Sequence, residues 1–135
     1  MRIGELSKHT GFQVETLRYY EKQGLLAPVS RTESGYREYD NDSLRQLQFI
    51  RKAKSVGFSL NEILELLTLR VERDQHSCGD VKAIAEQKIT QIENKIEELN
   101  EMLQALHKIT DACCGGVEPA TSCTILNSLD SGDLA

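Results

Sequence analysis

The sequence lacks any long hydrophobic run. No apolar stretch approaches the roughly 18 residues needed to span a bilayer. The first residues, MRIGELSKHTG, also lack the basic segment followed by an apolar one that marks a secretory signal. We therefore expect a cytoplasmic protein with no membrane partner. In a reducing cytosol, cysteines are more often metal ligands or redox groups than disulfides, and this chain has four: Cys78, Cys113, Cys114 and Cys123.

Motifs of the common enzyme classes are also missing. The sequence has no GxSxG, HExxH or P-loop pattern, and no general base lies at a suitable spacing from a cysteine. We therefore expect that the protein is not an enzyme, and a hydrolase is the weaker alternative. A metal-binding protein that does not bind DNA is a second alternative.

Positive charge is scarce overall but concentrated at one end. The formal net charge is −5. Residues 1–54 carry ten Lys/Arg and seven Asp/Glu, a net of +3, whereas residues 55–135 carry six and fourteen, a net of −8. A basic N-terminal part, here called the head, followed by an acidic remainder is expected when only one part of a protein contacts phosphate. Because most surface charge is simply solvated, this asymmetry indicates nucleic acid only together with a motif.

Hydrophobic spacing predicts a mainly α-helical head. Helices are expected over 3–9 and 14–22, with Gly11 between them and Gly24 at the end, as in a helix-turn-helix or an ordinary helical hairpin. RTESGYREYD (31–40) predicts a β-hairpin, whose Arg and Tyr side chains suit the DNA backbone in a wing. Alternatively, its tyrosines pack beneath the hairpin, and we expect at least one to do so.

Two more helices complete the predicted head. One covers 41–54, and the next begins after Ser59, which can form a capping box with Glu62. We place a winged helix-turn-helix DNA-binding domain at 1–70 and a polar connector at 71–80.

A heptad pattern then predicts one long helix over 81–111. Apolar residues recur at alternating steps of four and three over more than three heptads: Ala85, Ile89, Ile92, Ile96, Leu99, Leu103 and Leu106. A helix of this length can bury its stripe most simply against a second copy, so we expect a homodimer. The alternative is that the helix packs back on its own head.

The last segment, 112–135, predicts a metal-binding loop and a short C-terminal helix, with polar residues 127–135 frayed. Three thiols in CC-x8-C spacing, beside two glycines, suit Zn(II), Cd(II) or Pb(II) better than core packing. Cys78 lies 35 residues before Cys113, roughly 50 Å along a continuous helix. It can therefore join the loop cysteines only across an antiparallel dimer, and in a parallel dimer it has no role.

These segments together resemble the MerR family of transcription activators over essentially the whole chain. The resemblance rests on the segments IGELSKHTGFQVETLRYYEKQGLL, RTESGYREY and DACCGG (111–116), together with Cys78 in HSC and Cys123 in SCTIL. The resemblance implies an antiparallel coiled-coil homodimer on palindromic operator DNA, which it distorts for RNA polymerase when metal binds, usually at a metal-export gene. It also implies DNA-binding residues: Thr16, Arg18, Tyr19 and Tyr20 on the second helix, and Tyr36 and Arg37 on the wing.

Within that family the chain is similar to the zinc-responsive, ZntR-like branch. This implies Zn(II) as effector, with one ion on Cys113 and Cys123 and another on Cys114 and the partner's Cys78. The branch often has a loop histidine where this chain offers only Glu118, which can ligate zinc or remain solvated. That departure keeps a Cd(II), Pb(II) or Hg(II) sensor open as an alternative.

Copper(I) members lack the thiol at position 78. An iron–sulfur sensor would need four closely spaced cysteines, and too few residues follow position 110 for a multidrug-binding domain.

Overall fold

The computed structural model describes residues 1–132. It is mainly helical, as the sequence predicts, and divides into two compact units, Met1–Ala85 and Glu86–Ala135. Each unit is described by itself. No helix within residues 1–132 is long and apolar enough to cross a membrane.

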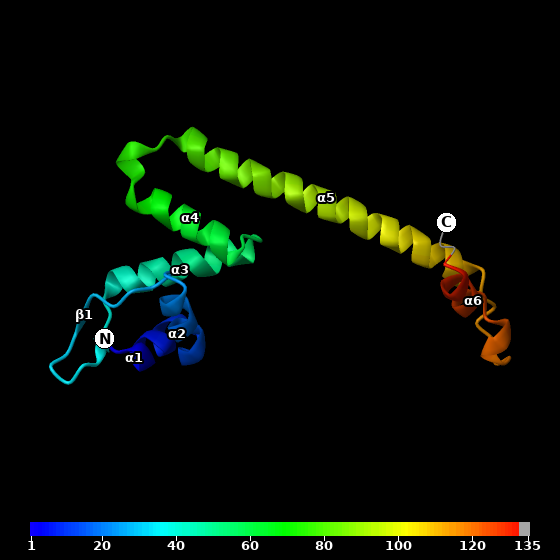
Figure 1. Cartoon of the computed structure of the whole chain (residues 1–135), viewed down its shortest axis with the longest axis horizontal. Coiled ribbons are helices and arrows are strands. Elements are labelled where there is room, and N and C mark those ends of the chain that lie inside the picture. The colour runs from blue at the N-terminus through cyan, green and yellow to red at the C-terminus, as the bar shows by residue number, and fades with distance from the viewer. Residues whose placement is uncertain (133–135) are drawn as a thin grey trace. The chain divides into compact units, whose positions relative to one another are not determined.

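Residues 1–71 of the first unit form four helices and a two-stranded hairpin (Figure 1). The elements are α1 (Ile3–Thr10), α2 (Val14–Lys22), β1 (Ser30–Arg31), β2 (Arg37–Glu38), α3 (Asn41–Ser55) and α4 (Leu60–Val71). The predicted helices at 3–9, 14–22 and 41–54 are therefore confirmed to within a residue. Helix α1 contacts α2 and α3, and α3 contacts α4.

Local signals explain where these helices begin and end. Gly11, with a φ of 79°, closes α1 in the left-handed conformation that glycine adopts freely. The predicted capping box at α4 is present, since the Ser59 side chain accepts from the amide of Glu62 and the Glu62 side chain accepts from the amide of Ser59. Asp40 and Ser43 form an equivalent box at α3.

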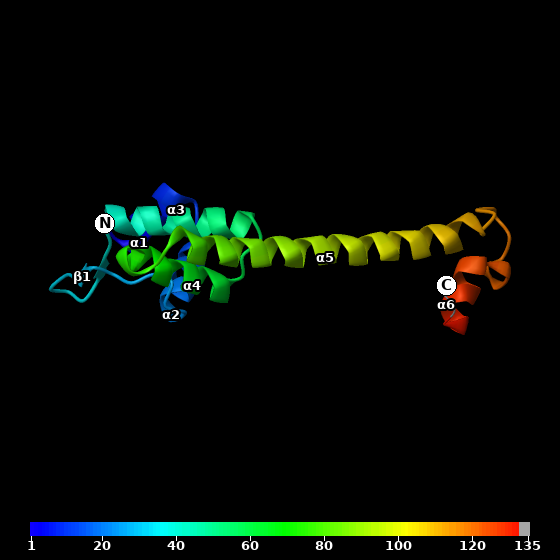
Figure 2. The ribbon, with the colours of Figure 1, turned by 90° about the horizontal axis from the view of Figure 1, so that it is seen from above.

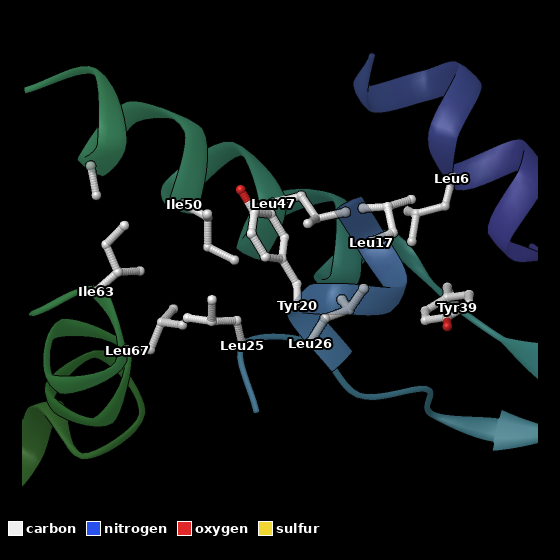
Figure 3. Close-up of a cluster of buried hydrophobic side chains, with 11 residues drawn as sticks. Leu6, Leu17, Tyr20, Leu25, Leu26, Tyr39, Leu47, Ile50, Ile63 and Leu67 are labelled. Atoms are coloured by element: carbon white, nitrogen blue, oxygen red, sulfur yellow. The ribbon is translucent and has the colours of Figure 1, made fainter. Parts of the chain in front are cut away.

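A single apolar cluster holds the first unit together (Figure 3). Its members come from all four helices and from the segments that follow α2 and precede α3: Leu6, Leu17, Tyr20, Leu25, Leu26, Tyr39, Leu47, Ile50, Ala53, Ile63 and Leu67. The short hairpin has Ser30 opposite Glu38 and Arg31 opposite Arg37. Tyr39, directly after β2, packs into the core, whereas Tyr36 at the hairpin tip remains 56% exposed.

A short 3-10 turn, η1 (Arg73–Gln75), leads into the long helix α5 (Cys78–Asp111), drawn as one continuous helix in Figure 2. The helix begins at residue 78 and not at 81 as the sequence analysis expected. The reason is a further capping box. The Ser77 amide donates to Asp80 Oδ2 at 3.0 Å, and the Asp80 amide donates to Ser77 Oγ at 3.2 Å. The Ser77 amide also lowers the pKa of the Asp80 carboxyl.

After α5 the chain forms a loop with the turn η2 (Ala120–Ser122) and then the short helix α6 (Thr124–Ser131). The predicted C-terminal helix is present. The expectation that 127–135 is frayed is wrong for 127–131, because α6 has an apolar side and is closed by Gly132 at a φ of 72°. The rest of that expectation, at 133–135, falls outside the described residues.

Candidate nucleic-acid interface and candidate metal centre

A cationic cleft lies on the first unit between α1, α2 and the hairpin. Its charged lining consists of Arg2, Lys8, Arg18, Arg37 and a single acidic residue, Glu5. Arg18 is an exposed side chain on α2, the second helix of the helix-turn-helix. A groove with four cations and one anion, formed by a helix and a two-stranded ribbon, suits a phosphate backbone.

Two contacts hold the hairpin side chains at this cleft. The Arg37 guanidinium pairs with the Glu21 carboxylate, with 3.1 Å between Nε and Oε2, and so ties β2 to α2. The Arg2 guanidinium lies 4.3 Å from the centre of the Tyr36 ring, a cation–π contact that ties the start of α1 to the hairpin tip. The ribbon is therefore positioned against both helices of the helix-turn-helix.

The structure leaves most of the expected DNA-binding residues accessible. Arg18, Tyr19, Tyr36 and Arg37 are exposed, and Thr16 is half-buried on α2.

The expectation that Tyr20 contacts DNA needs correction. Its side chain is 1% exposed and lies among core residues of α3 (Figure 3). Its ring packs edge-on against Phe12, and its hydroxyl lies 3.3 Å from Lys54 Nζ. A side chain this deeply buried cannot reach a ligand. Tyr20 therefore anchors α2 to the core, while Tyr19 beside it is 48% exposed.

The second unit contains a cavity of about 360 Å³ in the loop between α5 and α6. All four donors that the sequence analysis singles out in this segment line it: Cys113, Cys114, Glu118 and Cys123. The Cys114 thiol donates to Glu118 Oε2 at 3.6 Å.

Cys123 has a particular electrostatic setting because it is the N-cap of α6. The amide of Leu126 lowers the pKa of the Cys123 thiol, helped by the amide of Ile125 and the Cys113 thiol, while desolvation acts in the opposite direction. Free amides at a helix N-terminus favour negative charge. The thiolate is the form that ligates metals, and this setting makes the thiolate of Cys123 easier to form.

The donor set fits a borderline or soft divalent ion only in part. Among residues 1–132, no three His, Cys, Asp or Glu side chains converge into a group that could hold a metal. A complete tetrahedral shell needs four ligands, so an ion bound at this loop would need further donors.

Cys78 is exposed at the first residue of α5 and belongs to the first unit. It borders an apolar pocket with Phe49, Leu66 and Leu69. Its neighbour His76 lies 3.2 Å from Glu72 Oε2 and 3.6 Å from Asp80 Oδ2. These contacts place the His76 ring between the carboxylates of Glu72 and Asp80.

Comparison with known proteins decides the family. The model described as MerR HTH family regulatory protein matches residues 1–69, and the one described as MerR, DNA binding matches 44–109. The chain belongs to the MerR family. It is thus a metal-responsive, DNA-binding transcription regulator and not an enzyme.

Two solved relatives of this MerR-family protein hold different heavy-metal ions. The chain is 41% identical to the HTH-type transcriptional regulator ZntR of Escherichia coli K12 over 97% of its own length and 93% of the relative's. It is similar to the lead(II) complex of PbrR691 from Ralstonia metallidurans CH34, at 39% identity, a TM-score of 0.86, and coverage of 96% of this chain and 98% of that one. The mercury(II) complex of MerR from Bacillus megaterium MB1 is 35% identical, with a TM-score of 0.74 and coverage of 96% and 99%.

Two cleft residues of this MerR-family chain, Arg2 and Lys8, were missed by the sequence analysis. Both lie in or next to α1, which the sequence presented only as the first helix of the motif. The Arg2–Tyr36 contact joins residues 34 positions apart. No local pattern predicts such a contact. The only available signal was that α1 carries cations on its exposed side.

Proposed function

We propose that this protein is a homodimeric regulator that activates a metal-export or metal-resistance promoter when it binds Zn(II) or a related divalent ion. The observation that carries the proposal is the cavity in which Cys113, Cys114, Glu118 and Cys123 meet, on a chain whose head has a cationic cleft. A sensor needs both an effector site and a DNA-binding surface, and these two features would supply them.

The dimer follows from the long helix. Seven of the large apolar side chains along α5 are 42–56% exposed in the single chain: Ile89, Ile92, Ile96, Leu99, Met102, Leu103 and Leu106. Six of them lie on the heptad stripe. A continuous exposed apolar stripe of this length is stable in water only when another helix covers it. A second copy of the chain is the partner that carries the same heptads.

An antiparallel pairing would also complete the metal site. The 34-residue α5 separates Cys78 from Cys113 in the chain, so the start of one α5 meets the loop of the other chain only if the helices run antiparallel. Cys113 with Cys123, and Cys114 with the partner's Cys78, would then supply the thiolates. When bound, a divalent ion would hold these thiolates in one coordination shell and so favour one arrangement of the interface.

The heads would carry that change to DNA. Arg18 and Arg37 would contact operator phosphates or base edges, and Arg2 with Tyr36 would hold the hairpin against the backbone. The solved relatives include an EcmrR–DNA complex within an RNA polymerase open complex, and HiNmlR bound to promoter DNA. By this likeness we propose that the dimer binds a palindromic operator, acts on RNA polymerase by distorting the DNA, and works in the cytoplasm.

In vitro transcription tests the function. The template is a promoter with an operator selected from random DNA, and Zn(II), Cd(II), Pb(II), Hg(II) and Cu(I) are titrated at buffered free concentrations. We expect activation by Zn(II) at the lowest free concentration, with Cu(I) silent. Activation by Cd(II), Pb(II) or Hg(II) but not by Zn(II) would mean that the proposed mechanism is correct and that the effector is a different metal. Operator binding with no response to any metal would overturn the proposal.

A further inference from the structure

We propose that Arg51 is a positioning residue for DNA recognition, which holds the turn between α1 and α2 and so fixes the place of α2 at the cationic cleft. Arg51 is exposed on α3, where a cation has two simpler explanations: it suits the C-terminal half of a helix, or it binds a phosphate. The proposal rests on the DNA binding of the family and not on the identity of the effector metal.

Arg51 contacts the turn on both sides of Gly11. Its guanidinium donates a hydrogen bond to the carbonyl of Thr10, the last residue of α1. The same group lies over the ring of Phe12, 4.3 Å from the ring centre. Carbonyls in the last turn of a helix have no partner inside that helix, so the Thr10 oxygen needs a donor from elsewhere. Arg51 supplies that donor from a position 41 residues later in the chain.

The planar shape of the guanidinium explains how one side chain makes both contacts. Its N–H donors lie in its plane, while its faces are free to stack on an aromatic ring. A lysine ammonium carries the same charge but is a point charge without a plane. The two contacts at this turn therefore suit an arginine and not cations in general.

The turn is shaped around this contact. Gly11 has a φ of 79°, and a Cβ at that position would lie 3.4 Å from Arg51 Nη2. Within the turn, the Ser7 hydroxyl donates to the Phe12 carbonyl at 2.6 Å, and the Phe12 amide donates to Thr10 Oγ1 at 3.3 Å. These two bonds close the turn on itself, and Arg51 links the closed turn to α3.

Aromatic packing connects the turn to the DNA-facing helix. The Phe12 ring packs edge-on against Tyr20, with 5.5 Å between the ring centres. The Tyr20 side chain reaches from α2 to the core residues of α3 (Figure 3), and its hydroxyl lies 3.3 Å from Lys54 Nζ. Arg18 is exposed on the same helix and lines the cleft. A shift of the turn would therefore move Arg18 relative to the hairpin.

A phosphate ligand and a positioning residue behave differently in salt. Among the described residues, the cations that line the cleft are Arg2, Lys8, Arg18 and Arg37, so Arg51 lies outside it. Loss of a phosphate contact weakens binding to all sequences alike and lowers the salt dependence of the affinity by about one ion. Loss of a positioning contact lowers the affinity for the operator alone and leaves the salt dependence unchanged.

Binding of the full-length protein to two DNA duplexes tests the proposal. One duplex carries an operator selected from random DNA by the parent protein, and the other has the same composition in scrambled order. Fluorescence anisotropy measures both affinities over a series of salt concentrations, without metal. We expect Arg51→Met to weaken operator binding by about tenfold or more, the order of one lost specific contact. Its affinity for the scrambled duplex should change by less than about twofold, because that binding is electrostatic.

Three further variants keep the result interpretable. Arg45→Met removes the same charge from an exposed position of α3 outside the cleft and should change neither affinity. Arg51→Lys keeps the charge but not the plane, so it should lose nearly as much operator affinity as Arg51→Met. Phe12→Leu removes only the stacked ring and should give a smaller loss. The helical circular dichroism of every variant should match that of the parent.

The outcomes separate this proposal from its alternatives and from the proposed function. Full operator affinity in Arg51→Met would overturn it. Equal losses on both duplexes, with a salt dependence lower by about one ion, would make Arg51 a phosphate ligand instead. Full rescue by Arg51→Lys would reduce its role to charge, and loss of the helical signal in Arg51→Met would assign it to the fold as a whole. A parent protein that binds the operator but responds to no metal would overturn the proposed function alone.

Discussion

The two units of the chain differ in how far their apolar side chains are buried. In the head, the cluster around Leu17, Leu47 and Ile50 is completely buried within a single chain. Along α5, Ile96, Leu99 and their neighbours are about half exposed. The head therefore has its own core, whereas the long helix has an apolar surface that needs a partner. The first unit is therefore self-contained, whereas the stripe on α5 belongs to the interface at which we propose that metal is sensed.

The largest effect is expected from a charge in the stripe. Leu99→Asp would place an unpaired carboxylate in each half of a paired interface, which costs several kcal/mol. We expect the dissociation constant of the dimer to rise at least about a thousand-fold, a change of about 4 kcal/mol. Sedimentation velocity over a range of concentrations measures it. Gln104→Asp adds the same charge outside the stripe and should leave the dimer intact. A parent chain that stays monomeric would contradict the proposal that a second copy covers the apolar stripe of α5.

The next effect concerns the head. Leu47 is fully buried, so Leu47→Ala should lower the free energy of unfolding by about 2–5 kcal/mol. Val29 is 58% exposed in the same unit. Val29→Ala should therefore change the free energy of unfolding by less than about 0.5 kcal/mol. Urea unfolding followed by circular dichroism compares the two. Similar losses in both variants would mean that the head does not have the core described above.

A smaller effect is expected at the cationic cleft. Arg18→Ala should weaken operator binding by about 1–3 kcal/mol, both with and without metal, because it removes a DNA contact from the head alone. Arg45 is a 67% exposed cation on α3 that does not line the cleft, so Arg45→Ala is the matched control. Fluorescence anisotropy at physiological salt measures both. Equal affinities of the two variants would remove Arg18 from the interface.

The smallest effect is expected from the ion pair that ties β2 to α2. Arg37 is 43% exposed, so its pairing with Glu21 is worth about 1 kcal/mol or less. Glu21→Gln should therefore lower operator affinity only a few-fold and leave the stability of the head nearly unchanged. The same anisotropy assay tests it. A loss as large as that of Arg18→Ala would mean that the hairpin is positioned mainly by this pair.

Sequence patterns predicted the parts of this fold that depend on local physics. The helix at 14–22 and the Ser59–Glu62 cap follow from apolar spacing and capping residues that lie within a few positions of one another. The Ser77–Asp80 cap is equally local, and this pair of residues predicts that α5 begins at residue 78. The burial of Tyr20 could not be predicted, because Tyr19 and Tyr20 are adjacent and only packing against α3 decides which one is covered.

The candidate site shows the same division. The CC-x8-C spacing predicted a loop in which the cysteines gather, and they line one cavity. Spacing alone could not pair Cys114 with Glu118, because that contact depends on the path of the turn at Gly115 and Gly116. The cleft residue Arg2 was missed for a similar reason, since its partner Tyr36 is distant in the sequence.

Native mass spectrometry of mixed dimers tests the central claim most directly. A dimer of one Cys78→Ser chain and one Cys114→Ser chain retains one intact Cys78–Cys114 combination only if the two thiols meet across the interface. We predict one ion more per mixed dimer than in dimers of the Cys78→Ser/Cys114→Ser double variant, and two more in the parent. A mixed dimer that binds no more metal than the double variant would contradict a metal site shared between the two chains.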